Sequence, residues 1–162
     1  MTTTTRPEAT IEAHPDLPLV TITREFDAPP AKVFRAHVEP ELYAKWAGPN
    51  GVATTVDRWD ARSGGSYRYI VLSHGVEQGF NGTFHELRQD ELIVQTFAWE
   101  GMPDGVALEK LRFEPLDGGR RTRLVAVSIV DSFEDRDAFL QSGMESGVVD
   151  GYAKLDALLA EG

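Results

Sequence analysis

The sequence predicts an α+β fold in which a curved, seven-stranded antiparallel sheet wraps around a long C-terminal helix. The last 20 residues carry apolar side chains at helical spacing, and most of residues 52–130 has strand character broken by glycine-rich turns. Two short helices follow the first strand. An amphipathic helix and one face of a sheet must each bury apolar surface, and packing them together does both. This element order is that of the helix-grip arrangement.

Residues 142–159 predict the long helix, because their apolar side chains recur every three or four positions. The apolar stripe consists of Met144, Val148, Tyr152, Leu155 and Leu159. Ser142 and Glu145 have the spacing of a capping box at the helix start. Gly147 and Gly151 each cost about 1 kcal/mol relative to alanine inside a helix. They indicate either loose packing or the close approach of another segment.

The preceding elements follow from alternation and from turn residues. A strand is expected at 19–26, a helix at 31–38 after two prolines, and a second short helix at 41–46. Six further strands are expected at 52–60, 66–73, 80–87, 92–99, 106–114 and 121–130. Short connections make neighbouring strands antiparallel. Ser132 is the expected N-cap of a helical turn over 132–141.

Composition narrows the function classes. The 162 residues suit one domain at 19–162, preceded by a Thr- and Pro-rich segment, 1–18, that we expect to be a disordered arm. The net charge of −10 opposes binding to nucleic acid, and no apolar run approaches the ~20 residues of a membrane span. The N-terminus has no hydrophobic signal core, so a cytoplasmic protein is expected.

Sequence motifs for metal, phosphate or nucleophile chemistry are missing. The chain has no cysteine, and its four histidines lack metal-ligand spacing, so we expect no metal and no cofactor. No G-x-S-x-G nucleophile motif and no phosphate-binding loop occurs. His37 is expected to be a packing residue on a helix. His85 should face water if its neighbour Phe84 faces inward.

Short motifs in a fixed order resemble a known family. They are FDAP at 26–29, VF at 33–34, PEL at 40–42, KWAGP at 45–49, DARSGGSYR at 60–68, GTF at 82–84, ELI at 91–93 and SGMESG at 142–147. With them the chain resembles the SRPBCC (START/birch-pollen-allergen-like) superfamily. Within it, the chain is similar to bacterial relatives of the C-terminal domain of the activator of the ninety-kilodalton heat-shock protein ATPase.

The resemblance implies a hydrophobic ligand cavity between sheet and terminal helix, and no defined catalytic set. Similarity to the activator does not by itself imply chaperone binding in a single domain of this kind, so chaperone docking is kept as an alternative, together with a role in stress response. Ala47 and Val148 stand where relatives often carry tryptophan, and both changes favour a roomier cavity. Val148, on the inward stripe, is therefore expected to face open space.

The candidate ligand-binding residues are mainly aromatic side chains expected on the inward faces of the strands and helices. They are Trp46, Tyr67, Tyr69, Phe80, Phe84, Phe97, Trp99, Glu109, Phe113, Met144, Val148 and Tyr152. Gln95 is a further polar group that could orient a ligand. For the last strand, Val125, Val127 and Ile129 are the expected inward set.

The leading hypothesis is the binding of a small hydrophobic molecule, a lipid or an aromatic metabolite, without a cofactor. One alternative is a module that docks a chaperone, another protein or its own copy as a homodimer. A second alternative is a cyclase or hydrolase acting in the same cavity. Polar cavity residues with perturbed pKa values would favour the enzyme, whereas a large exposed apolar patch would favour the docking module.

Overall fold

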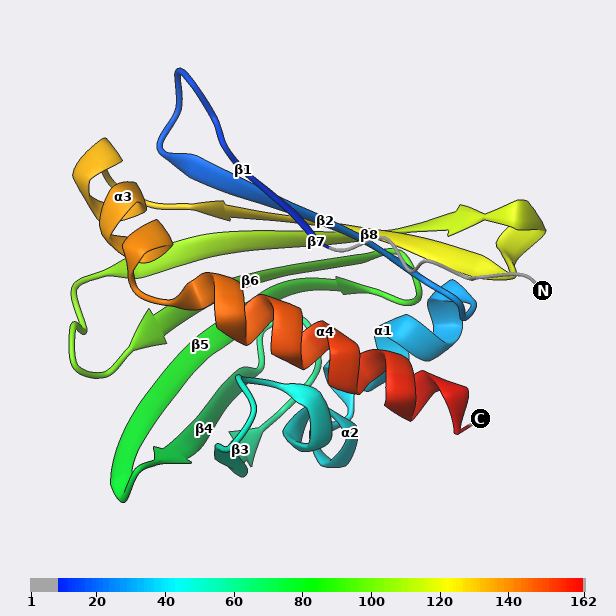
Figure 1. The fold of residues 1–162 in the computed structure, drawn as a ribbon, viewed down its shortest axis with the longest axis horizontal. Helices are drawn as coiled ribbons and strands as arrows, with labels where there is room; N and C mark the ends of the chain where they lie inside the picture. The colour runs from blue at the N-terminus through cyan, green and yellow to red at the C-terminus, as the bar shows by residue number, and fades with distance from the viewer. Residues whose placement is uncertain (1–8, 162) are drawn as a thin grey trace.

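One antiparallel sheet and one long helix form the two main layers of the computed structural model, which describes residues 9–161 (Figure 1). The sheet has eight strands in the order β1-β2-β8-β7-β6-β5-β4-β3. The strands are β1 Thr10–Ala13, β2 Leu19–Phe26, β3 Ala53–Trp59, β4 Ser66–Ser73, β5 Val76–Arg88, β6 Leu92–Trp99, β7 Val106–Leu116 and β8 Arg121–Ile129. The helices are α1 Pro30–Val38, α2 Pro40–Trp46, α3 Phe133–Gln141 and α4 Met144–Ala160, with a 3₁₀ turn at Asp117–Gly119. This is the predicted α+β, helix-grip-like fold.

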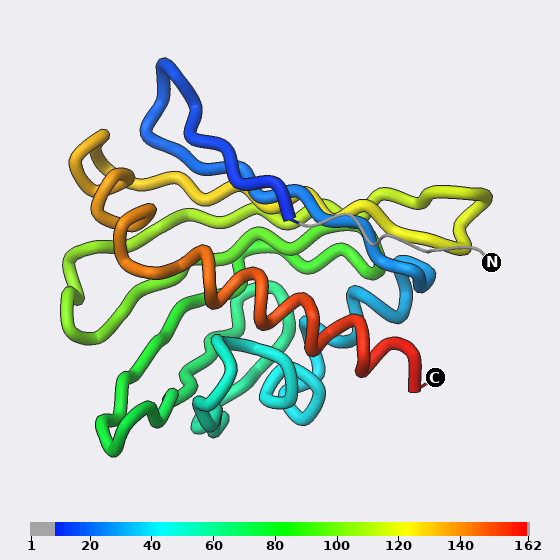
Figure 2. Tube along the Cα trace, in the orientation of Figure 1, coloured from blue at the N-terminus to red at the C-terminus, as the bar shows by residue number. Residues whose placement is uncertain are grey.

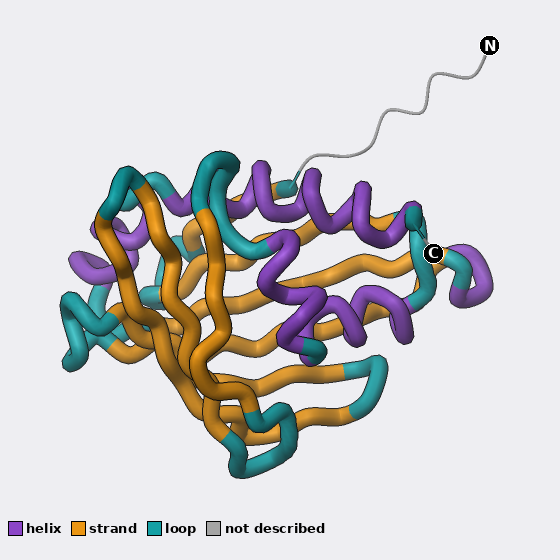
Figure 3. Tube along the Cα trace, turned by 90° about the horizontal axis from the view of Figure 1, so that it is seen from below, coloured by secondary structure: helices purple, strands orange, loops and turns teal. Residues whose placement is uncertain are grey.

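Helix α4 lies across the concave face of the sheet, and α1 and α2 fill the same side next to its C-terminal half (Figures 1 and 3). The predicted stripe faces the sheet: Tyr152 and Leu155 are buried, while Met144, Val148 and Leu159 are half-buried. The burial of α4 is therefore greatest in its C-terminal half. Gly151 makes this possible, because an added Cβ would lie 3.2 Å from the backbone oxygen of Trp46.

A buried ion pair joins α4 to the sheet. The Arg24 guanidinium on β2 donates two hydrogen bonds to the Asp156 carboxylate on α4, at 2.9 and 2.6 Å, and both side chains are 8% exposed. The same guanidinium lies 4.8 Å from the ring centroid of Phe26. Asp156 is not one of the residues of the predicted apolar stripe. The helix buries it because a bidentate arginine compensates its charge.

The eighth strand is a correction to the sequence prediction. β1 lies within the segment expected to be a disordered arm, and it pairs with β2 from Thr10↔Thr23 to Ala13↔Val20. The two strands form a hairpin at one edge of the sheet (Figure 2). The Arg136 guanidinium holds its turn by donating to the His14 carbonyl oxygen at 2.7 Å. Four residues, none of them buried, gave no clear alternation in the sequence. Residues 1–8 of the predicted arm lie outside the described residues.

The predicted capping box is also wrong. Helix α4 begins one residue after Gly143, whose φ of 89° is left-handed, and no side chain caps it. Ser142 instead ends α3, where its hydroxyl donates to the Phe139 carbonyl oxygen. Gly143 turns the chain between the two helices, a backbone conformation that favours glycine. The Ser132 cap of α3 is confirmed, since its hydroxyl oxygen accepts from the Asp135 amide.

The inward face of β8 was assigned to the wrong set of residues. Leu124 and Ser128 are buried on the concave side with Ala126 between them, while Val125, Val127 and Ile129 are half-buried members of the other set. Alternation defines the two sets of a strand but not which of them faces the core. Here the buried set contains the polar Ser128, whereas the other set is entirely apolar, so hydrophobicity alone favoured the wrong set.

Candidate functional site

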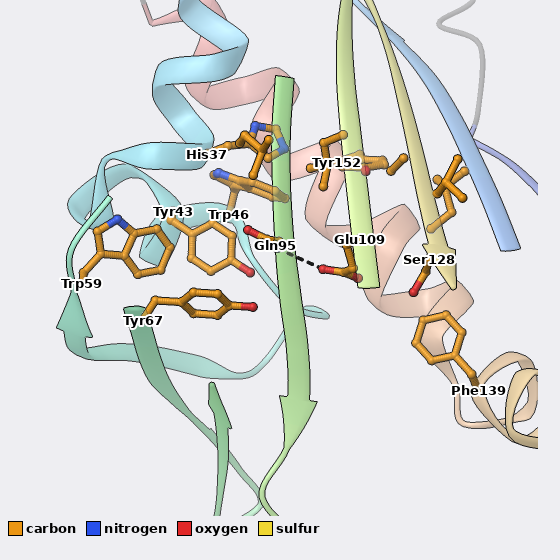
Figure 4. Close-up of a pocket in the computed structure, with 15 residues that line it drawn as sticks. His37, Tyr43, Trp46, Trp59, Tyr67, Gln95, Glu109, Ser128, Phe139 and Tyr152 are labelled. Carbon is orange, nitrogen blue, oxygen red and sulfur yellow. Dashed lines mark hydrogen bonds between the residues drawn. The ribbon is translucent and has the colours of Figure 1, made fainter. Parts of the chain in front are cut away.

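A cavity of about 140 Å³ lies between the concave face of the sheet and the helices (Figure 4). Its floor comes from β2, β6, β7 and β8, through Ile22, Ile93, Leu111 and Ala126 among others. Helices α1, α2, α3 and α4 supply His37, Tyr43 with Trp46, Phe139 and Tyr152, respectively. Strands β3 and β4 add Trp59 and Tyr67. The curved sheet and the crossing helix thus form the walls of the cavity that is expected for this fold.

One wall of the cavity is a continuous run of aromatic rings. His37 packs on Trp46 and Trp46 on Tyr43, with centroids 4.8 and 5.2 Å apart. Tyr43 then packs on Trp59 at 5.2 Å, and Trp59 on Tyr67 at 5.5 Å. These five residues come from four elements. The rings hold one another in edge-on and tilted contacts, which fixes the shape of the wall.

The polar hydrogens of this wall are already used within the protein. The indole N–H of Trp46 donates to the Ala36 carbonyl at 2.9 Å, and that of Trp59 donates to the Val38 carbonyl at 2.7 Å. The Tyr67 hydroxyl donates to the Thr96 carbonyl at 2.6 Å. The Tyr43 hydroxyl donates to the Tyr69 hydroxyl at 3.3 Å. The oxygens of Tyr43 and Tyr67 keep lone pairs that can accept hydrogen bonds.

His37 is neutral and oriented. Its Nδ1 lies 2.7 Å from the Val33 carbonyl oxygen, which can only accept, so Nδ1 carries the proton. Burial lowers the pKa of His37 to about 4, against the smaller raising effect of that hydrogen bond. At neutral pH the other ring nitrogen, Nε2, is therefore an acceptor. The expectation that His37 is a packing residue is confirmed by its 7% exposure and its ring contacts.

Three polar residues face one another across the sheet at the centre of the cavity. The Gln95 amide on β6 donates to the Glu109 carboxyl on β7 at 2.9 Å (Figure 4). Ser128 on β8 lies opposite Glu109 in the strand register. Its buried hydroxyl has no hydrogen-bond partner among the described residues. Register alone brings these side chains together, because all three point to the concave face.

Glu109 is the ionisable group of this cluster. Burial raises the pKa of its carboxyl above the ordinary value, and the hydrogen bond from Gln95 and the nearby Ser128 hydroxyl oppose this less strongly. Burial is also the main cause that raises the pKa of Tyr43 to about 12, with Glu109 adding to it. The pKa of Tyr152 is raised for the same reasons. Burial thus makes ionisation of the Glu109 carboxyl and of the phenols less favourable than in water.

Of the predicted ligand-binding residues, Trp46, Tyr67, Glu109 and Tyr152 line the cavity. Tyr69, Phe80 and Phe97 form a stacked series beside it, with centroids 5.4 and 5.5 Å apart, and Trp99 is 39% exposed beyond them. The remaining four, Phe84, Phe113, Met144 and Val148, also lie outside the lining. Val148 packs half-buried against the core, so the cavity does not open toward it as expected.

Sequence reasoning missed Tyr43, Trp59 and Ser128 as cavity residues. Tyr43 and Trp59 lie on α2 and β3, and they meet only because α2 folds back against the edge of the sheet. No local pattern encodes that contact. Ser128 could have been found from its register, since it stands opposite Glu109, which had been selected.

Residues 9–161 contain neither a membrane-spanning helix nor a cluster of metal ligands. No described helix is long and apolar enough to cross a membrane. Within the same residues, no three His, Asp or Glu side chains gather where they could hold a metal ion.

The fold and the cavity define a helix-grip domain with a partly open, aromatic-lined pocket. The chain belongs to the family of Activator of Hsp90 ATPase homolog 1-like proteins, whose match spans residues 27–160, within the SRPBCC superfamily. No curated protein matches the sequence.

Solved structures of bacterial proteins agree with this assignment. One from Chromobacterium violaceum is 30% identical, with a TM-score of 0.77, covering 87% of this chain and 96% of that one. One from Mycobacterium smegmatis is 26% identical, with a TM-score of 0.83 and coverages of 96% and 99%. An AHSA1-like protein from Aeromonas hydrophila shares the fold at 20% identity, with a TM-score of 0.64 and coverages of 87% and 94%.

Proposed function

We propose that this protein binds a small molecule about the size of one aromatic ring in the cavity between its sheet and helices. The observation that carries the proposal is a partly open cavity of about 140 Å³. A cavity of about 150 Å³ holds benzene, whereas drug-sized ligands occupy roughly 300–1,000 Å³. Of the two ligand classes expected from the sequence, the volume favours an aromatic metabolite over a lipid.

The lining supports a ligand with a flat apolar body and one polar group. Rings from His37 to Tyr67 offer faces and edges for aromatic packing. At the centre, Gln95, Glu109 and Ser128 offer hydrogen bonds that would fix the orientation of a polar substituent. This combination of many apolar contacts and a few convergent polar groups is typical of small-molecule sites.

A matched pair of alanine substitutions tests the proposal. Ala126 lines the cavity, so Ala126→Leu should fill part of it and weaken the binding of small rings such as toluene and phenol. Ala153→Leu, on the exposed side of α4, makes the same change away from the cavity and should leave binding unchanged. Ligand-observed NMR titrations measure both. If no ring compound binds the unaltered protein, or if Ala126→Leu binds equally well, the proposal fails.

A second candidate function is catalysis in the same cavity, and one observation favours it. A carboxyl whose pKa is raised by burial is suited to act as a general acid or base near neutral pH. Glu109 would then be the proton-transferring group of a cyclase or hydrolase. Mass spectrometry of a bound ligand over time tests this: chemical conversion by the unaltered protein that is lost in Glu109→Gln supports catalysis. Binding without conversion leaves the first function. Chaperone docking stays an alternative hypothesis.

A further inference from the structure

Glu109 has no cationic partner in its cavity. No lysine or arginine is among the residues that line the space. The buried Arg24 on β2 is engaged by the carboxylate of Asp156 through two hydrogen bonds. His37 on α1 is neutral because burial lowers its pKa to about 4. The other titratable groups around the cavity are the phenols of Tyr43, Tyr67 and Tyr152, which carry no positive charge.

The cavity wall presents mainly hydrogen-bond acceptors. The polar hydrogens of Trp46, Trp59 and Tyr67 all point to backbone carbonyl oxygens. The Tyr43 hydroxyl uses its hydrogen on Tyr69. This wall leaves the lone pairs of the Tyr43 and Tyr67 oxygens and the Nε2 of His37 for a ligand, and Glu109 adds its carboxyl oxygens. Beside them, Gln95, Ser128 and Tyr152 can also donate a hydrogen bond. A ligand rich in donors complements this set.

We propose that the cavity binds a small organic cation, an arylalkyl primary amine such as benzylamine, whose ammonium group pairs with Glu109 while its ring packs on the aromatic wall. The inference rests on the proposed small-molecule function and specifies its ligand class. An ammonium group brings three donors and the missing positive charge. The Ser128 hydroxyl, opposite Glu109 in the register, has a lone pair that can accept a further hydrogen bond from it.

The aromatic wall favours the same ligand. Electron-rich faces of tryptophan and tyrosine attract cations within about 6 Å, and more strongly where water is excluded. Trp46, Tyr43 and Trp59 lie in continuous contact along the wall. Binding would also relieve the cost of the buried acid, since an ammonium ion next to Glu109 favours its charged form. An anionic ligand would meet acceptors and a carboxylate instead.

A series of ligands with one shape tests the inference. Benzylamine, benzyl alcohol, toluene and benzoate present an ammonium, a hydroxyl, a methyl and a carboxylate group on the same ring. Titration calorimetry at pH 7 should show benzylamine binding at least tenfold more tightly than benzyl alcohol or toluene, and no binding of benzoate. This comparison uses the unaltered protein, so it does not depend on any variant folding.

A matched pair of variants locates the preference. Glu109→Gln keeps the shape but removes the charge, and it should abolish the advantage of benzylamine while leaving toluene binding in place. Glu114→Gln, an exposed residue of the same strand, should leave the advantage unchanged. If benzyl alcohol or toluene binds as tightly as benzylamine, the cation inference fails while the proposed function stands. If none of the four compounds binds, both fail.

Discussion

Two carboxylates lie on the concave side of the sheet, and the protein treats them differently. Asp156 on α4 receives two hydrogen bonds from Arg24 and is 8% exposed. Glu109 on β7 receives one hydrogen bond from the neutral Gln95 and lines a cavity that contains no lysine or arginine. One charge is compensated within the fold, and the other is not.

The difference gives Asp156 a structural role and leaves Glu109 as the candidate functional group. A buried charge is expensive unless it is paired, and a paired charge is expensive to break. Asp156 therefore fixes α4 to β2, between residues that are distant in sequence. No cation offsets the free-energy cost of desolvating the Glu109 carboxylate, and this cost raises the pKa of the carboxyl. The fold does not need such a group for stability.

Removing the paired carboxylate should cost the most. Asp156→Ala leaves Arg24 buried without its counter-charge, so we expect the free energy of unfolding to fall by about 3–5 kcal/mol. Urea unfolding measures it. Asp150→Ala is the matched control on the same helix, because the Asp150 carboxylate accepts only from the Asn50 amide in an exposed position. The control should lose about 1 kcal/mol or less. Equal losses in the two variants would show that the ion pair does not hold the helix.

Leucine truncations test whether the C-terminal half of α4 is packed as tightly as the ion pair suggests. Leu155 is fully buried, so Leu155→Ala should lower the free energy of unfolding by about 2–5 kcal/mol. Leu159, one turn further along, is half-buried, and the same substitution should cost distinctly less. Urea melts of both variants give the comparison. A larger loss at Leu159 would contradict the packing described for this helix.

Glu109→Gln should raise the free energy of unfolding rather than lower it, and the gain should depend on pH. The folded pKa of Glu109 is raised, so the folded state holds its proton more tightly than the unfolded state. Below the ordinary value of 4.5 both states are protonated and the group has no effect. As pH rises above that value, Glu109 ionises first in the unfolded state, which becomes more favourable relative to the folded state. The free energy of unfolding therefore falls by up to about 1.4 kcal/mol per pH unit until the pH passes the pKa of Glu109 in the folded state. Glutamine removes this loss.

Unfolding curves recorded from pH 4 to pH 9 should therefore show that the free energy of unfolding of Glu109→Gln increases relative to that of the unaltered protein as pH rises. Glu100→Gln is a control of opposite sign. Hydrogen bonds from Arg68 are the first cause that lowers the pKa of Glu100, so its contribution is present above 4.5 and lost as pH falls. A pH-independent difference for Glu109→Gln would mean that the carboxyl is not protonated preferentially in the folded state.

Much of the fold could be predicted because its signals are local. The stripe on α4, the alternation in β2 and β4, and the Ser132 cap each depend on neighbours in sequence. Most of the site could not, since it depends on contacts between distant segments. The meeting of Tyr43 with Trp59, and of Arg24 with Asp156, is set by how α2 and α4 dock on the sheet. Glu109 was found because a charged residue in an inward register is conspicuous, whereas Ser128 was not.

The smallest effects should come from the two glycines of α4, and they compare its tightly docked half with the half nearer its start. An alanine Cβ at position 147 would meet only the Pro49 Cδ, at an ordinary 3.8 Å. Gly147→Ala should therefore raise the free energy of unfolding by up to about 1 kcal/mol through helix propensity. At position 151 the Cβ would lie 3.2 Å from the Trp46 carbonyl oxygen, so α4 must shift away from α2. There the same propensity gain should be cancelled or reversed. Chemical unfolding of the two variants decides between these outcomes: equal stabilisation would show that α4 does not need Gly151 to approach α2, and the close docking that positions Tyr152 at the cavity would need another cause.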